Sequence, residues 1–461
     1  MQLKHPKLTL AVISLSYLML TVDLSIAVTA LPLIQKDLGF STASLSWIQN
    51  AYTLTFGGLL LLGSRIGDLF GRRRMYVWGL LFFMLASVVV VISPNAEIMI
   101  LGRVLQGLGA AILGPSSLAL LSTSFPDQPQ RGKAMAIYGS ITGIGPTLGL
   151  VLGGLIAEIW DWRWAFLINV PIGTVLMFAS HRYLNETAKQ KVKVDVWGAI
   201  FSTVGMGSVV YALIRSAEFG WNDSLVWSFL IFGLLTLVGF VLVEKRIAAP
   251  LVPLRLFKSR QRSGANLARA LFVGSMAVYW FYTSQYLQIA KGMNPLETGL
   301  AFLPMTLASF GIAFFVPRLS ARFGDTPFLA GGLITVAAGT LWLSQLTPNG
   351  SYFLEVALPM LLIGIGQGAS TIRLTSAGVA GVAPADAGAA SGLVTMHVQL
   401  GQPLFLSIMI TIASLVPVAG LAANQVIAHQ ANAAIFGGGI LCLIALAVVL
   451  IFVLPKKHVE D

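Results

Sequence analysis

Apolar residues fill long runs over most of the chain, and short polar stretches separate these runs. An α-helix needs about 20 predominantly apolar residues to cross the hydrocarbon core of a bilayer. About fourteen runs approach or reach that length. They lie near residues 9–31, 45–63, 75–93, 96–118, 132–157, 164–181, 196–214, 224–243, 265–288, 299–317, 327–346, 354–375, 388–415 and 434–454. The pattern predicts an all-α integral membrane protein with 14 spans.

Two polar links divide these runs into groups. The link at 181–195 is rich in lysine, and the link at 244–262 carries basic residues and two prolines. Segment 317–325 is a weak echo of segment 64–74, which supports an internal duplication. We therefore predict two pseudo-symmetric six-helix bundles plus two extra transmembrane helices. Their expected bounds are 1–184 for the N-terminal bundle, 185–262 for the two additional helices with their basic cytoplasmic links, and 263–461 for the C-terminal bundle.

Composition supports this class. Hydrophobic residues make up 56% of the chain and charged residues only 10%, which is too little polar surface to cover a soluble globule. The net charge of +11 suggests nucleic acid at first, but most Lys and Arg flank the links on one side of the predicted spans. The other side holds Lys36, Arg163, Arg215 and Lys291. This asymmetry predicts that both termini are cytoplasmic, and it argues against a nucleic-acid partner.

Charged residues inside the spans are the first functional candidates, because a charge in hydrocarbon is costly. Asp23 and Arg103 both lie roughly 10–12 Å below the outer end of their predicted spans, so they can pair. Such a pair indicates a proton path, or alternatively a static brace for the first bundle. His397 lies within the thirteenth predicted span and is either a third proton-handling group or an ordinary packed histidine.

Polar and aromatic residues within the spans are candidates for lining a substrate cavity. Most aromatic residues in such positions serve packing, which is the alternative interpretation. The candidates are Gln49, Asn50, Tyr52, Gln106, Tyr282, Gln285, Gln288 and Gln399. The polar segments show no glycine-rich nucleotide loop, no cluster of metal ligands and no Ser-His-Asp arrangement, so we expect neither an enzyme nor a cofactor.

Segment 64–74, SRIGDLFGRRR, is expected to turn between the second and third spans at the cytoplasmic face. Gly71 allows a sharp bend, and Asp68 lies next to Arg72 and Arg73. An acid here can pair with an arginine or with a helix N-terminus, and so latch this side of the protein in one conformation. The alternative is an ordinary basic loop.

Glycines recur every fourth residue in the fifth predicted span. Gly145, Gly149 and Gly153 form one smooth stripe on a helix, and Pro146 predicts a kink. A bent helix with this face suits a place where two bundles pack tightly in one state and part in another. Static packing is the alternative interpretation.

Several segments together resemble one known family. The chain resembles, over essentially its whole length, the fourteen-span drug:proton antiporters of the major facilitator superfamily. Segment 64–74 looks like the loop motif of that superfamily, and 101–111, LGRVLQGLGAA, is similar to its fourth-helix motif with a buried arginine. Residues 23–32, 162–173 and 286–304 resemble stretches typical of the fourteen-span branch.

The resemblance departs from the family pattern at two positions. Ser64 replaces the first glycine of the loop motif, and Leu150 stands where the antiporter motif has proline. The second departure bears on the direction of transport. The resemblance still implies a monomeric multidrug efflux transporter of the bacterial inner membrane, driven by the proton gradient without a cofactor.

The expected function is proton-coupled export of hydrophobic or amphipathic monocationic drugs and antiseptics by alternating access. Asp23 would exchange a proton for substrate, and Arg103 would adjust its proton affinity or relay the proton. One alternative is a dedicated exporter or importer of a single metabolite, such as a siderophore or a lipid. Another is a membrane sensor that transports nothing.

Overall fold

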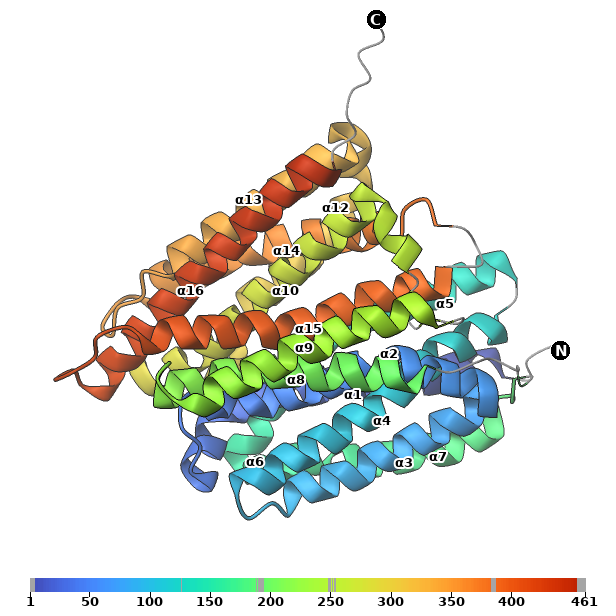
Figure 1. Cartoon of the computed structure of the whole chain (residues 1–461), viewed down its shortest axis with the longest axis horizontal. Coiled ribbons are helices and arrows are strands. Elements are labelled where there is room, and N and C mark those ends of the chain that lie inside the picture. The colour runs from blue at the N-terminus through green and yellow to red at the C-terminus, as the bar shows by residue number, and fades with distance from the viewer. Residues whose placement is uncertain are drawn as a thin grey trace, which may run out of the picture. The chain divides into compact units, whose positions relative to one another are not determined.

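The computed structural model describes residues 5–125, 127–187, 189, 195–247, 250, 252, 254–382 and 387–453. Within these ranges every regular element is a helix (Figure 1). The main helices are α1 (Pro6–Leu38), α2 (Trp47–Phe70), α3 (Arg72–Val91), α4 (Ala96–Ser124), α5 (Gln128–Ile159), α6 (Trp162–Leu167), α7 (Asn169–Tyr183), α8 (Val196–Phe219), α9 (Ser224–Arg246), α10 (Arg260–Gln285), α11 (Pro295–Ala301), α12 (Leu303–Phe323), α13 (Asp325–Leu343), α14 (Leu358–Gly378), α15 (Ala387–Ser414) and α16 (Ala423–Val448).

The predicted all-α membrane class is confirmed. Eleven helices of the described chain are long and apolar enough to cross a membrane. The three other predicted runs contain α2, α10 and α13, of which α13 is a shorter apolar helix. The number of 14 spans therefore stays a prediction.

Two predicted spans are interrupted by a turn residue. Ile168 separates α6 from α7, and Phe302 separates α11 from α12. A proline follows each break within three residues, at Pro171 and Pro304. Because proline lacks an N–H group and its ring clashes with the preceding turn, the helix is weakened at both places.

The chain forms two compact units. One unit comprises Met1–Leu251 and Leu287–Ala301, and the other comprises Val252–Tyr286 and Phe302–Asp461. By compactness, α8 and α9 therefore group with the first six-helix bundle, and so does α11. In the first unit α4 packs against α2 and α3, while α1 packs against α5. In the second unit α14 packs against α12 and α13, and α10 packs against α15 and α16.

The first unit has an aromatic core between its first four helices. Tyr52, Tyr76, Phe83 and Leu113 are all fully buried in this core. The aromatic rings support the inner faces of α1 and α4. These faces carry Asp23 and Arg103.

Candidate functional site

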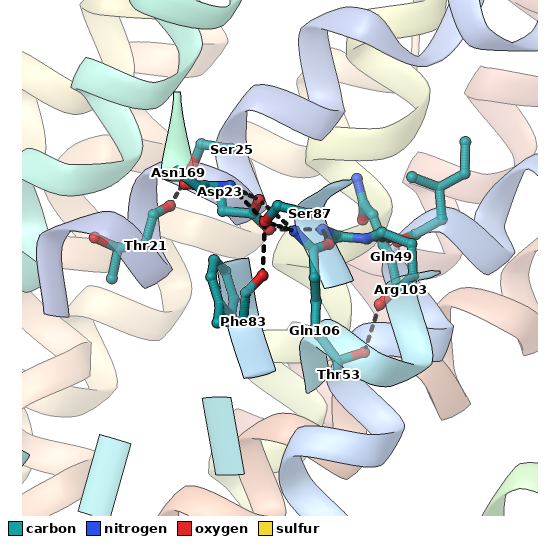
Figure 2. Close-up of polar contacts among 11 residues, drawn as sticks. Thr21, Asp23, Ser25, Gln49, Thr53, Phe83, Ser87, Arg103, Gln106 and Asn169 are labelled. Carbon is teal, nitrogen blue, oxygen red and sulfur yellow. Dashed lines mark hydrogen bonds and ion pairs between the residues drawn. The ribbon is translucent and has the colours of Figure 1, made fainter. Parts of the chain in front are cut away.

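The predicted pair of charges is present in the first unit (Figure 2). Asp23 lies on α1, and Arg103 lies on α4. Asn95 begins α4 by accepting a hydrogen bond from the Ile98 amide at 3.0 Å, which helps to define its register. The Asp23 Oδ2 atom accepts a hydrogen bond from Arg103 Nη1 at 2.6 Å, and both side chains have an exposed fraction of 0%.

Two side-chain amides donate to the other oxygen of Asp23. Asn169 Nδ2 lies 2.7 Å from Asp23 Oδ1, and Gln106 Nε2 lies 3.1 Å from the same atom. The Ser87 hydroxyl accepts from both amides, at 3.4 Å from Asn169 and 2.8 Å from Gln106. Hydrogen bonds to a charged acceptor are stronger than those between neutral groups. The cluster therefore provides hydrogen bonds to both oxygens of the buried Asp23 side chain.

Arg103 is held from several sides. Its Nε atom donates to the Ile48 carbonyl at 2.7 Å, and Nη1 also donates to Gln106 Oε1 at 2.7 Å. The guanidinium carbon lies 4.7 Å from the ring centroid of Tyr52 and 5.6 Å from that of Phe166. Within the described chain, Arg103 Nη2 and the Tyr52 hydroxyl lack a hydrogen-bond partner. These two atoms leave polar capacity in the cluster for water or another small polar group.

Asn169 and Ser87 were missed as site residues by the sequence reasoning. Asn169 is the first residue of α7, directly after the break at Ile168. An amide within the apolar stretch 165–176 was a usable signal, because buried amides in membranes need partners. Ser87 gave no such signal, since serine is common on packed membrane helices.

The predicted cavity residues of the first unit have different surroundings. Tyr52 and Gln106 belong to the Asp23 cluster. Gln49 and Asn50 lie in the first turn of α2, where Asn50 Nδ2 donates to the Ser46 hydroxyl at 3.4 Å. Gln288 Nε2 donates to the Thr29 carbonyl of α1 at 3.1 Å.

The predicted polar residues of the second unit lie at different positions along two helices. Tyr282 and Gln285 lie on α10, whereas His397 and Gln399 lie on α15. A Cβ atom at Gly401 would contact Ala270, and one at Gly274 would contact Phe405. Because the residue numbers of the contacts increase together on both helices, α10 and α15 run in the same direction. At 1.5 Å per residue, the two pairs are about 20 to 30 Å apart along the helix axes. These four residues therefore do not form one cluster.

His397 has an ordinary packed environment. Its Nδ1 atom lies 2.8 Å from the Leu393 carbonyl, and its ring centroid lies 6.3 Å from that of Phe257. This contact with the preceding helical turn matches the alternative that the sequence left open, although the proposed proton-handling role stays a prediction.

The N-terminus of α3, directly after the turn from α2, is capped by side chains. Asp68 forms an ion pair with Arg72, one of the two pairings expected for this acid. Gly71 has a φ angle of 101°, which favours glycine. The backbone amides of Arg73 and Arg74 each donate to the Glu186 carboxylate at 3.0 Å.

The amide of Arg72 completes this cap by donating to the Thr187 hydroxyl at 3.1 Å. The N-terminus of α3 is thus neutralised by an acid from the link that follows α7, and not by Asp68. Glu186 was not predicted from the sequence, because its position beside the turn depends on how α7 packs against α3.

The glycine stripe of α5 faces α1 within the same unit. A Cβ atom at Gly149 would lie 2.6 Å from the Cβ of Ser25, and one at Gly153 would lie 2.8 Å from the Cα of Ile26. Gly145 approaches Thr21 in the same way. The predicted close approach of another backbone is therefore present, and its partner is α1. Any part in a conformational change stays a prediction.

The structure of α5 shows the surroundings of Pro146 and of Leu150, the position where the antiporter motif has proline. The helix is continuous through Pro146. On another face, the backbone at Leu150 contacts Gly299, and Gly154 contacts Pro295, so α5 also holds α11. Leu150 is buried and stands where the antiporter motif has proline.

Comparisons with known proteins agree with this architecture. The sequence model of the Major Facilitator Superfamily matches residues 13–406. The chain is 38% identical to the puromycin resistance protein pur8 of Streptomyces alboniger, over 88% of this chain and 81% of that protein. It is 36% identical to the cephamycin export protein CmcT of Amycolatopsis lactamdurans, over 86% and 83% of the two chains.

A solved structure shares the fold at low sequence identity. The inward-facing, unoccupied form of a bacterial homologue of the human lysosomal transporter Spinster matches with a TM-score of 0.71 and 14% identity. The match covers 98% of this chain and 97% of that chain. Together with the family match over most of the sequence, these findings identify a multi-pass membrane transporter and not an enzyme. The chain belongs to the Major Facilitator Superfamily.

Proposed function

We propose that this transporter is a proton-coupled antiporter that exports hydrophobic or amphipathic drugs and antiseptics by alternating access. The observation that carries the proposal is the buried pair of Asp23 and Arg103, which share a hydrogen bond at 2.6 Å. Protonation of Asp23 would leave the Arg103 charge without its counterion in an apolar interior. Losing one partner of a buried pair costs about 3–5 kcal/mol, which is enough to favour another arrangement of the helices.

Arg103 is proposed to transmit the protonation of Asp23 to the neighbouring helices. It contacts both Asp23 and the backbone of α2 at Ile48. A proton arriving at Asp23 therefore changes the contacts of α1, α2 and α4 together. Such shared contacts are a physical route from protonation to a movement of helices.

The substrate is proposed to bind without touching the Asp23 carboxylate. Both oxygens of Asp23 already accept hydrogen bonds, and the side chain is inaccessible. Exchange of one proton for one monovalent cation moves no net charge, whereas each uncompensated charge involves about 2.3 kcal/mol per 100 mV. We therefore propose lipophilic monocations as the preferred substrates.

The same proposal includes the topology and the energy source. Fourteen spans would place both termini in the cytoplasm of a bacterial inner membrane, in agreement with the distribution of Lys and Arg. The proton gradient would drive transport by a monomer that needs no cofactor.

A dedicated exporter of one metabolite is the second candidate. The name of the related cephamycin export protein refers to a single compound, which favours this candidate. Raised resistance to many unrelated cationic dyes on overexpression would support the first candidate. Accumulation of one metabolite in a deletion strain would support the second.

Inside-out vesicles test the assigned role of Asp23. Substrate added to acid-loaded vesicles should release protons in the wild type, and Asp23→Asn should abolish this release because the exchangeable carboxyl is gone. Asp37→Asn is the matched control, since Asp37 lies on the same helix but is exposed and pairs with Arg163. Undiminished proton release from correctly folded Asp23→Asn protein would refute the role.

A further inference from the structure

An apolar groove lies in the second unit, whereas the Asp23 cluster belongs to the first. It has a volume of about 310 Å³. The walls are α12 and α13, and the floor is α14. Its lining residues are Ile312, Pro327, Phe328, Gly331, Gly332, Thr335, Ile365 and Ala369. From Pro327 to Thr335 the groove follows α13 for about 12 Å.

Glycines of the floor helix explain why the groove exists. A Cβ atom at Gly368 would meet Ser309 and Ile312 of α12, and one at Gly366 would lie 2.5 Å from Val336 of α13. The helix α14 therefore approaches both neighbours closely, on two different faces. Between these two lines of contact Ile365 remains exposed, whereas Ala369 is buried at the base of the groove. Gly331 adds space, because a Cβ atom there would have no neighbour within 4 Å.

The lining offers hydrocarbon contacts and no available hydroxyl. Thr335 already donates its hydroxyl hydrogen to the Gly331 carbonyl at 2.8 Å. Pro327, Gly331 and Ile365 are exposed, so the groove opens on the outside of the bundle, where lipid surrounds a membrane protein. A flexible acyl chain fits these properties better than a substrate that needs polar groups for orientation.

Charge at one end of the groove indicates which lipid it would hold. The Pro327 end adjoins the C-terminal end of α12, where Arg318 and Arg322 are both exposed. Asp325 is the one acid of the turn between α12 and α13, so the local net charge is positive. An acyl chain gains little when it moves from lipid into an apolar groove, so selectivity must come from the headgroup.

We propose that this groove binds one acyl chain of an anionic phospholipid, whose phosphate lies beside Arg318 and Arg322. The positive-inside pattern places this turn at the cytoplasmic leaflet, where basic residues attract anionic headgroups. The bound lipid bridges α12 and α13 over α14 and stabilises their arrangement. The site is independent of the proposed role of Asp23.

Thermal unfolding of the purified full-length protein in detergent tests the site. The probes are phosphatidylglycerol and phosphatidylcholine with the same acyl chains. Phosphatidylglycerol should raise the Tm of the wild type more than phosphatidylcholine does, because a ligand stabilises the state that binds it. Gly331→Leu, which fills the groove, should remove this difference. The double variant Arg318→Gln/Arg322→Gln should also remove the difference, because it removes the charges proposed to bind the phosphate.

Matched controls separate the site from general effects. Gly207→Leu adds the same side chain at another glycine with no neighbour within 4 Å, and it should keep the full lipid effect. Lys245→Gln/Arg246→Gln removes an exposed basic pair at the end of α9 and should also keep it. Each variant is compared with its own Tm without lipid, so a lower baseline does not obscure the result.

Three results would overturn the proposal. The first is an unchanged preference for phosphatidylglycerol in Gly331→Leu, which would assign the effect to headgroup charge alone. The second is an equal loss in the controls. The third is that a transported drug, but not lipid, stabilises the wild type, and that Gly331→Leu removes this stabilisation. This result would assign the groove to substrate.

Discussion

Asp23 shows how single side chains make a buried charge tolerable. The carboxylate receives one guanidinium and two amides, and Ser87 orients both amides by accepting from them. Removing one partner of such a network leaves the others unsatisfied in a medium that cannot replace them. The position of the charge thus depends on residues from α3, α4 and α7 as well as on its own helix.

Asn169→Ala tests this dependence. The hydrogen bond from Asn169 to a charged acceptor should contribute about 1.5–3 kcal/mol to the free energy of unfolding. We therefore expect a lower Tm in detergent and slower substrate-evoked proton release in vesicles. Asn185→Ala is the control, because Asn185 is exposed on the link after α7. Equal behaviour of the two variants would mean that Asn169 does not support Asp23.

At the scale of elements, α1 is held between the charged cluster and α5. The residues of α1 that meet the glycine stripe are Thr21, Val22, Ser25 and Ile26. On a helix Thr21 and Ser25 lie on the side away from Asp23, whereas Ile26, three residues further on, lies beside it. Close packing of α5 therefore fixes the position of α1, the helix that carries Asp23.

Gly149→Val should disturb this arrangement. Its side chain would overlap Ser25 and the backbone of Val22, and overpacking of this kind costs about 1–3 kcal/mol. We expect a lower Tm and a reduced transport rate. Gly139→Val, on the same helix but with no neighbour within 4 Å, should leave both close to the wild type. A wild-type transport rate in Gly149→Val would show that the close approach is dispensable.

A second element-scale feature is the cap of α3 by Glu186. The carboxylate accepts from two backbone amides, so Glu186→Ala should cost about 0.5–2 kcal/mol of stability. We expect the resulting fall in Tm to be larger than that of Glu158→Ala, since Glu158 is an exposed acid at the end of α5. Limited proteolysis of the link after α7 provides a second readout. An unchanged cleavage rate together with an unchanged Tm would contradict the cap.

At the scale of the whole molecule, the chain forms two compact units, and the three-part division expected from the links stays a prediction. The extra helices α8 and α9 pack against each other, and α8 also packs against α2. The contacts of α5 with Leu287–Ala301 bring a segment from later in the chain into the first unit. Links in sequence mark where spans end, whereas packing decides which spans form one compact unit.

Cysteine labelling tests the number and direction of the spans. The native Cys442 is buried, so introduced cysteines report alone. With 14 spans, Asn222→Cys and Ala419→Cys should react with a membrane-impermeant maleimide in intact cells. Lys133→Cys and Asn185→Cys should react only after permeabilisation. All four positions are exposed in the structure, so lack of reaction reports the membrane side. The opposite pattern would reverse the topology.

The sequence by itself determined the membrane class, the helical ranges and the family, because long apolar runs have one stable solution in a bilayer. It also placed Asp23 and Arg103 at equal depth, since depth follows from counting residues along a helix. Only the tertiary structure decided that Asn169 and Ser87 join this pair, that Glu186 caps α3, and that the glycine stripe faces α1. Each of these depends on which faces of distant helices meet, and this is set by packing complementarity that the spacing of residues within one helix does not encode.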